Sequence, residues 1–231
     1  MSNALVIAID GPSGSGKSTL AKRLARHYGL QYLDTGSMYR VATVWCVDRG
    51  IDLDDQAAVA VAVRQMPLEM VTDPGAPRVL LDGEDVTARL HTAEVSTVVS
   101  KVAVNLAVRA ELKARQRAII DAERTDGRSR GRGIVAEGRD ITTVVAPDAD
   151  VRILLIATPG DRLARRATER HGAADEHAIE ATRDEVIRRD AQDSTVSEFM
   201  HAHEGVVTLD NSGWQPDETF AAAVAIVDAA R

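Results

Sequence analysis

Short apolar segments alternate along the chain with longer segments whose apolar residues recur at helical spacing. The first is Leu5-Val6-Ile7-Ala8-Ile9, whose β-branched residues are typical of a buried strand. Leu20 and Leu24 follow at helical spacing and predict a helix. Four more short apolar segments lie at residues 31–33, 134–140, 150–158 and 206–212. Five strands that alternate with helices predict a parallel sheet covered on both faces.

A long insertion separates the second of these predicted strands from the third. Its apolar spacing predicts helices at residues 41–47 and 57–63, and a helical region over residues 92–123 that is broken near Asn105. Residues 67–82 predict a β-hairpin, because Asp73-Pro74-Gly75 supplies a turn between two apolar segments. Beyond the fourth strand, Pro159 opens an arginine-rich helix, and residues 175–190 and 216–230 predict two more helices.

The composition narrows the class of protein. The chain has 231 residues, 45% of them hydrophobic and only 3% aromatic, so alanine, valine and leucine must fill the core of a globular domain. A net charge of −7 argues against an extended nucleic-acid surface. Cys46 is the only cysteine, which excludes a disulfide within the chain and fits the cytoplasm. The sequence shows no signal peptide and no long apolar span, so we expect a cytoplasmic monomer without a membrane partner.

A phosphate-binding loop directly follows the first strand. Residues 11–18 match G-x-x-x-x-G-K-[ST] between a predicted strand and a predicted helix, which is the context that this motif requires. Glycines allow successive backbone N–H groups to converge on an anion, and the helix start adds further donors. Lys17 is expected to reach the β- and γ-phosphates and Ser18 to bind Mg²⁺. The predicted ATP-binding residues are Gly11, Pro12, Ser13, Gly14, Ser15, Gly16, Lys17, Ser18 and Thr19.

Repeated arginines favour a kinase of a phosphate-bearing molecule. Phosphoryl transfer depends on positioning and on neutralising spread negative charge, and each guanidinium can bind two phosphate oxygens. The guanine-binding pattern N-K-x-D of GTPase switches is absent from the sequence. Two alternatives stay open: a P-loop kinase of another small metabolite, such as shikimate or a sugar, and a nucleotide-dependent switch protein. The candidate arginines are Arg40, Arg109, Arg139, Arg162, Arg165, Arg166, Arg188 and Arg189.

Four further motifs, in order and over nearly the whole chain, resemble bacterial cytidylate kinase. They are "DTGSMYR", the Ser100…Arg109 pair, "EGRDITTVV" followed by "PDA", and "RRDAQDST". The resemblance implies a P-loop NTPase-type α/β fold of three layers around a central parallel five-stranded sheet. It also implies a single domain with a core at about 1–35, 134–158 and 174–231. An inserted NMP-binding subdomain with a small sheet would occupy about 36–133, and a short helical lid about 159–173.

The implied activity is ATP-dependent phosphorylation of CMP and dCMP to CDP and dCDP, with Mg²⁺ accompanying ATP. By position, Arg40 and Arg139 would clamp the α-phosphate of CMP. The resemblance places the remaining residues as follows: Thr35, Ser100, Arg109 and Asp140 at cytosine, Tyr39 as a packing or stacking residue beside it, Arg189 and Asp193 at the sugar, Arg162 and Arg166 over the ATP phosphates, and Glu137 with Ser18 at Mg²⁺ through water. The catalytic residues would be Lys17, Arg139, Arg162 and Arg166.

Two positions depart from the family pattern. Glu137 stands where the family usually has aspartate, so its longer side chain must still reach the Mg²⁺ water. Val196 stands where the family often has an arginine, so a guanidinium contact to the acceptor nucleotide is lost or comes from a neighbour. We expect the site to select cytosine over uracil, because the two bases present different hydrogen-bonding groups. The amino group of cytosine can donate to Asp140, whereas the carbonyl of uracil at the same position would repel that carboxylate.

Overall fold

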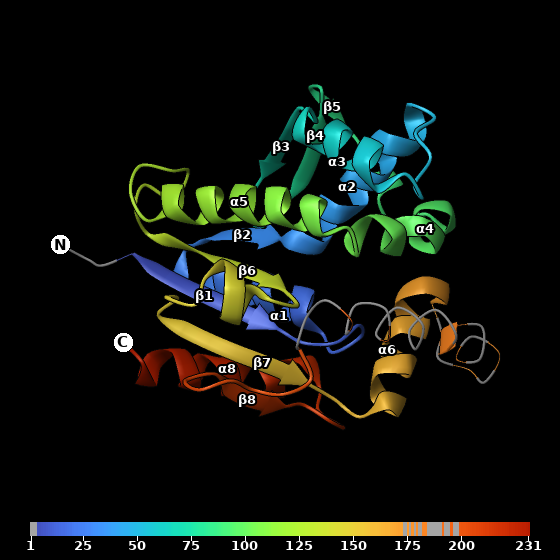
Figure 1. Cartoon of the computed structure of the whole chain (residues 1–231). Helices are drawn as coiled ribbons and strands as arrows, with labels where there is room; N and C mark the ends of the chain where they lie inside the picture. Colours follow the sequence, from blue (N-terminus) through green and yellow to red (C-terminus); the bar gives the residue numbers. More distant parts are fainter. Residues whose placement is uncertain are drawn as a thin grey trace.

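A five-stranded parallel sheet forms the centre of the protein (Figure 1). The structure, a computed structural model, describes residues 4–172, 175, 177, 179, 182, 183, 191, 195 and 199–231. The strands lie in the order β2-β6-β1-β7-β8, and each neighbouring pair is parallel. The five predicted core strands are confirmed, with the bounds β1 Leu5–Asp10, β2 Gln31–Asp34, β6 Gly133–Gly138, β7 Val151–Ile156 and β8 Val207–Asp210.

The sheet separates two hydrophobic cores. Side chains of β1 alternate between them, residues 6 and 8 facing one core and residues 5, 7 and 9 the other. Helices α2 and α5 cover the first core, and α1 and α8 cover the second, which gives the predicted three layers. The bounds of these helices are α1 Lys17–Tyr28, α2 Thr35–Asp48, α5 Leu106–Glu123 and α8 Pro216–Ala229.

A second, antiparallel sheet lies in the insertion above the β2 edge of the core (Figure 1). Strands β3 (Leu68–Val71) and β4 (Arg78–Leu81) form the predicted hairpin, and the short β5 (Glu84–Asp85) adds a third strand. Helices α3 (Gln56–Arg64) and α4 (Ala93–Ala103) complete the insertion. Helix α4 packs against both α2 and α5, so the insertion is joined to the core through its helices.

Side chains that cap helices set the element boundaries. The Asn105 side chain accepts hydrogen bonds from the N–H groups of Ala107 and Val108, which starts α5 and explains the break after α4. Asp34 caps α2 in the same way, and Thr158 caps α6 (Pro159–His171), the helix that Pro159 opens. Within the described residues, none of the helices combines the length and hydropathy needed to cross a membrane.

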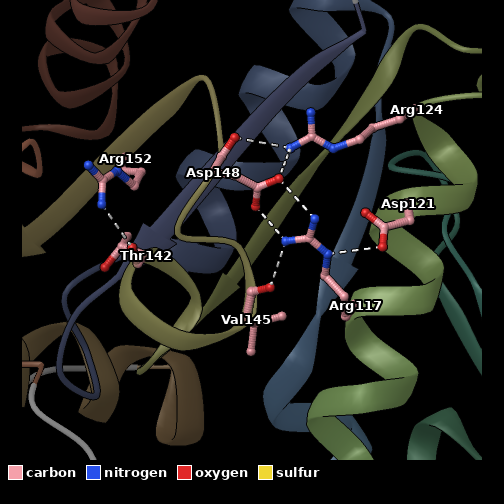
Figure 2. Close-up of polar contacts among 7 residues, drawn as sticks. All are labelled: Arg117, Asp121, Arg124, Thr142, Val145, Asp148 and Arg152. Atoms are coloured by element: carbon pink, nitrogen blue, oxygen red, sulfur yellow. Dashed lines mark hydrogen bonds and ion pairs between the residues drawn. The ribbon is translucent and has the colours of Figure 1, made fainter.

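An ion-pair network fastens α5 to the chain that follows β6 (Figure 2). Both terminal nitrogens of Arg117 bind the carboxylate of Asp148, with Nη2 at 2.8 Å from Oδ2, and Nη1 also donates to the Val145 carbonyl. Arg117 Nε donates to Asp121, one turn along α5, and Arg124 reaches Asp148 Oδ2 at 3.3 Å. The guanidinium of Arg117 holds the pKa of Asp148 below its usual range. The end of the insertion is therefore fixed to the core.

Asp10, at the end of β1, organises the turn after β6. Its carboxylate accepts hydrogen bonds from the N–H groups of Ile141 and Thr142 and from the Thr142 hydroxyl. These contacts start a π-helical turn, Ile141–Val145, which the sequence did not predict. Arg152 of β7 donates to the Thr142 carbonyl at 3.3 Å (Figure 2). Arg139 and Asp140 lie between the end of β6 and this turn.

Candidate active site

The phosphate-binding loop takes up backbone conformations that require glycine. Gly11, Gly14 and Gly16 have φ of +151°, +77° and +93°. A Cβ on Gly11 would lie 2.1 Å from the Leu155 carbonyl oxygen, and one on Gly14 would lie 2.4 Å from that of Arg162. Within the described residues, no side chain caps the start of α1, which leaves its first N–H groups available to an anion. The loop has the geometry of an anion-binding site.

The neighbouring strand brings a carboxylate to this loop. Glu137 pairs with Ile9 in the register of β6 and β1, so it sits beside the point where β1 enters the loop. The Tyr32 hydroxyl donates to Glu137 Oε1 at 2.8 Å, and the Ser18 side chain also hydrogen-bonds to Glu137. Lys17 Nζ spans the loop and donates to the Pro12 carbonyl at 2.8 Å. Ser18 and Glu137, the two residues predicted to serve Mg²⁺, thus contact each other directly.

Burial raises the pKa of Glu137 to about 7. Removal of its carboxylate from water is the largest cause, and the negative charge of Asp34 adds to it. Lys17, Ser18 and Tyr32 oppose the shift without cancelling it. Near neutral pH a cation placed at this carboxylate would favour its ionised form, so the group can change its charge when a metal–nucleotide complex arrives.

This shift predicts a pH dependence of stability for the nucleotide-free protein. Because the pKa of Glu137 is higher in the folded than in the unfolded chain, the folded state gains stability at low pH and loses that gain as pH rises through 7. Between about pH 5 and about pH 8, the free energy of unfolding of the wild type should fall by about 2–3 kcal/mol relative to Glu137→Gln. Urea unfolding across this range measures the difference.

The matched control for that comparison is Glu94→Gln, at an exposed glutamate in the first turn of α4. Its stability relative to the wild type should not change with pH over the same range. A Glu137→Gln curve that runs parallel to the wild-type curve would show that Glu137 is ionised throughout, and would contradict the effect of burial on it.

One cleft of about 200 Å³ joins the loop to the arginines of the other elements. Arg40 enters it from α2, Arg139 from the end of β6, and Arg166 from α6. His91, which precedes α4, also lines it. The structure therefore brings together these sequence-predicted residues: Ser13, Gly14, Gly16, Lys17, Ser18, Thr19, Arg40, Glu137, Arg139 and Arg166.

Arginines of α6 lie directly against the loop. Arg162 Nη1 donates to the Ser13 carbonyl at 3.0 Å and is buried. Arg165, one turn away, donates to the Ser15 carbonyl at 3.2 Å and to Asn211 Oδ1 at 2.9 Å. The predicted lid helix thus contacts the loop with Arg162 and lines the cleft with Arg166, while Arg165 fastens the helix to the segment after β8.

The residues predicted to read the base gather between α5 and the end of β6. Arg109 Nη2 lies 2.6 Å from Asp140 Oδ2, and the guanidinium lies 5.8 Å from the centre of the Tyr39 ring. Tyr39 packs against the hydrophobic core, in agreement with a packing role. Ser100 is half-buried on α4, which packs against α5.

Two of the residues predicted to bind CMP also form hydrogen bonds with backbone carbonyl groups around the cleft. Thr35 is buried, and its hydroxyl donates to the Glu137 carbonyl at 2.7 Å. Arg40 Nη1 donates to the Leu90 carbonyl at 2.8 Å and to the Ser96 hydroxyl at 3.1 Å, so it also positions the start of α4. Arg188, Arg189, Asp193 and Val196 lie outside the described residues.

Sequence reasoning missed two features of the site. Lys113 Nζ lies 2.9 Å from Asp140 Oδ2, next to Arg109. Its place four residues after Arg109 on a predicted helix was the available signal. The second feature is a cavity of about 640 Å³ on the other side of the loop, lined by Gly14, Gly16, Thr19, Arg165, Asn211, Trp214 and Gln215 among others. The sequence feature that could have indicated this cavity is the polar segment after the last strand, because ligands bind beyond the carboxyl ends of the strands of a parallel sheet.

Comparison with known proteins points to one family. The family model described as cytidylate kinase matches residues 7–228. A cytidylate kinase from Cutibacterium acnes is 44% identical over 224 residues, covering 96% of each chain. One from Nocardia farcinica is 45% identical over 221 residues, covering 94% of this chain and 90% of that one. One from Streptomyces avermitilis is 43% identical over 192 residues, covering 83% of this chain and 78% of that one.

Proposed function

The chain belongs to the cytidylate kinase family and catalyses ATP-dependent phosphorylation of CMP and dCMP, and we propose that the cleft beside the phosphate-binding loop is where the transfer takes place. The observation that carries this proposal is that one cleft is lined both by Lys17 of the loop and by Arg40 and Arg139 from other elements. A donor and an acceptor phosphate need cations from two directions. The loop supplies one direction and the arginines the other.

ATP binds along the loop, with its phosphates over residues 11–19 and its nucleoside in the cavity of about 640 Å³. The loop N–H groups and the start of α1 hold the phosphate oxygens. Lys17 exchanges its contact with the Pro12 carbonyl for the β- and γ-phosphates. Trp214 and the stem of Arg23 offer apolar surface to the adenine in that cavity.

Mg²⁺ fits the oxygen donors at the start of α1. The Ser18 hydroxyl and the Glu137 carboxylate already contact each other, and both are hard ligands of the kind that Mg²⁺ prefers. We assign Ser18 to the ion and Glu137 to a water of the ion, with the ATP phosphates completing the set. The ion, when bound, neutralises charge that develops on the transferred phosphoryl group. Tyr32 keeps the carboxylate of Glu137 directed toward Ser18.

CMP binds on the side of the insertion. Arg40 and Arg139 clamp its phosphate, and Asp140 accepts from the exocyclic amino group of cytosine while Arg109 donates to its ring. The remaining residues assigned to CMP are Thr35, Tyr39 and Ser100 at the base and Arg189 and Asp193 at the sugar. Because the acceptor phosphate is already ionised, its oxygen attacks without a general base, and the site has only to align it.

Four cations stabilise the transfer: Lys17 and Arg139 from the two sides of the cleft, and Arg162 and Arg166 from α6. We assign residues 159–173 to a lid that excludes water from ATP, residues 36–133 to the acceptor-binding insertion, and residues 1–35, 134–158 and 174–231 to the core. We further propose that the enzyme works as a cytoplasmic monomer. Its lone Cys46 allows no disulfide within the chain and so fits the reducing cytosol.

Steady-state ADP production tests this function. With ATP and Mg²⁺, CMP and dCMP should support turnover, UMP should be poorer in kcat/KM by roughly ten- to a thousandfold, and shikimate and AMP should give no more than background hydrolysis. Turnover with shikimate rather than CMP would favour a kinase of another metabolite. ADP release only in the presence of a protein partner would favour a switch.

Asp140→Ala tests the assignment of the base pocket. The variant should lose far more kcat/KM with CMP than with UMP, because only cytosine donates to the missing carboxylate. The ratio of kcat/KM for CMP to kcat/KM for UMP should therefore fall by about tenfold or more. Equal proportional losses on the two substrates would show that Asp140 holds the turn after β6 and does not read the base.

A further inference from the structure

Two cations of one helix contact a single oxygen of Asp140. Arg109 Nη2 is 2.6 Å from Oδ2, and Lys113 Nζ, one turn further along α5, is 2.9 Å from the same atom. The Arg109 and Asp140 side chains are 9% exposed and that of Lys113 is 23% exposed. Arg109 alone would balance the charge of Asp140, so neutrality does not explain the presence of Lys113.

The contacts of Asp140 are one-sided. An arginine usually binds both oxygens of a carboxylate. Arg109 instead contacts Oδ2 through Nη2, while its Nη1 donates to the Ala103 carbonyl at 3.2 Å. Within the part of the chain that the structure describes, the contacts of the Asp140 carboxylate fall on Oδ2. The second oxygen, Oδ1, is left for a ligand.

The backbone near Asp140 makes no use of this carboxylate either. Asp140 stands at the start of the π-helical turn, a position where an aspartate side chain commonly caps the helix. Its side chain makes no such hydrogen bond, because Asp10 caps the turn through the N–H groups of Ile141 and Thr142. Among the described residues, those that hold the carboxylate therefore belong to α5.

We propose that Lys113 is a positioning residue for base selection, which holds Oδ2 of Asp140 so that Oδ1 accepts the amino group of cytosine. The proposal rests on the base-reading role assigned above to Asp140. An ammonium group is a compact point charge, so it fixes one oxygen without competing for the other. With two donors on Oδ2, rotation of the carboxylate would break two charged contacts at once.

Lys113→Met removes the charge and keeps most of the stem. The CMP:UMP ratio of kcat/KM should fall about five- to thirtyfold, because hydrogen bonds to a charged group lose that much when they are poorly aligned. The loss should appear mainly as a higher KM for CMP, with kcat within about threefold of the wild type, because Lys113 contacts the base pocket and not the cleft of the phosphates. Lys113→Arg should leave the ratio at least about threefold below the wild type, because a guanidinium can bind both oxygens and then competes with cytosine for Oδ1.

A double-mutant cycle separates an action through Asp140 from a direct contact with the base. In an Asp140→Ala background, Lys113→Met should change the CMP:UMP ratio by less than about twofold, since the group it positions is gone. The matched control is Lys101→Met on α4, which removes an equivalent ion pair with Asp54 at an exposed site. This control should keep the ratio of the wild type. Thermal unfolding of each variant shows whether it is folded. If Lys113→Met does not fold, Lys113→Gln is used in its place.

Each result has one interpretation. If Asp140→Ala leaves the ratio unchanged, the base pocket assigned to the enzyme is wrong, and the role of Lys113 falls with it. If Asp140→Ala narrows the ratio but Lys113→Met does not, the positioning role alone is overturned. Equal effects of Lys113→Met in both backgrounds would also overturn it, because Lys113 would then act independently of Asp140.

Discussion

Lys17→Ala should lower kcat at least about a hundredfold and leave the fold intact. Lys17 Nζ is placed over the loop by its contact with the Pro12 carbonyl and lines the cleft rather than a hydrophobic core. Its loss removes positive charge from the place where the transferred phosphoryl group gains negative charge, and single groups of this kind contribute a factor of roughly 10²–10³. Steady-state ADP production with saturating CMP and ATP measures the effect.

Lys22→Ala is the matched control, because Lys22 lies on the same helix with its Nζ over the ring of Tyr32, at 5.4 Å from the ring centre. It should keep kcat within about twofold. Both variants should unfold within about 3 °C of the wild type. If purified Lys17→Ala retains more than about a tenth of the wild-type kcat, the loop does not position the transferred phosphate as proposed.

Arg139→Met should lower kcat/KM for CMP by about a hundred- to a thousandfold. Arg139 is the one residue that we assign both to the acceptor phosphate and to the transfer itself, so its loss affects binding and kcat together. Its guanidinium lies 4.6 Å from the centre of the Phe199 ring, so packing as well as charge determines its orientation. Arg139→Lys should be intermediate, because an ammonium group keeps the charge but cannot bind two oxygens in parallel.

The KM for ATP distinguishes this role from a general loss of structure, because it should change less than about threefold in Arg139→Met. Arg26→Met, at an exposed position in the last turn of α1, is the control and should behave as the wild type. A fivefold loss or less in Arg139→Met would mean that Arg40 alone can bind the acceptor phosphate.

Features that depend on neighbouring residues could be predicted from the sequence. The strand, the glycines and the helix of the phosphate-binding loop are contiguous, and the positive φ of Gly14 and Gly16 is a local requirement. Asn105 interrupts the helical region where the pattern indicates, because its side chain caps α5 directly. The five strands were visible as short apolar segments, although nothing in their pattern gives the order β2-β6-β1-β7-β8.

Features that depend on residues far apart in the chain could not be predicted from the sequence. The contact of Lys113 with Asp140 arises only when α5 lies against the end of β6, and periodicity alone does not say what a helix face contacts. The cap that Asp10 provides to Thr142 joins residues on different elements in the same way. The sequence left open whether Glu137 could serve in place of aspartate. Its hydrogen bonds with Ser18 and Tyr32 fix the longer side chain beside the loop.

The position of β1 in the middle of the sheet has a consequence for the growing polypeptide. Its two partners, β6 and β7, begin at Gly133 and Val151, so β1 leaves the ribosome long before either neighbour exists. Until Gly133 has been synthesised, β1 exposes both rows of backbone hydrogen-bonding groups together with its apolar residues, a state that favours aggregation. The insertion, with its own small sheet, is complete by then. The nascent chain therefore contains the whole insertion, to which we assign the acceptor, before the strand that leads into the phosphate-binding loop can pair with its neighbours.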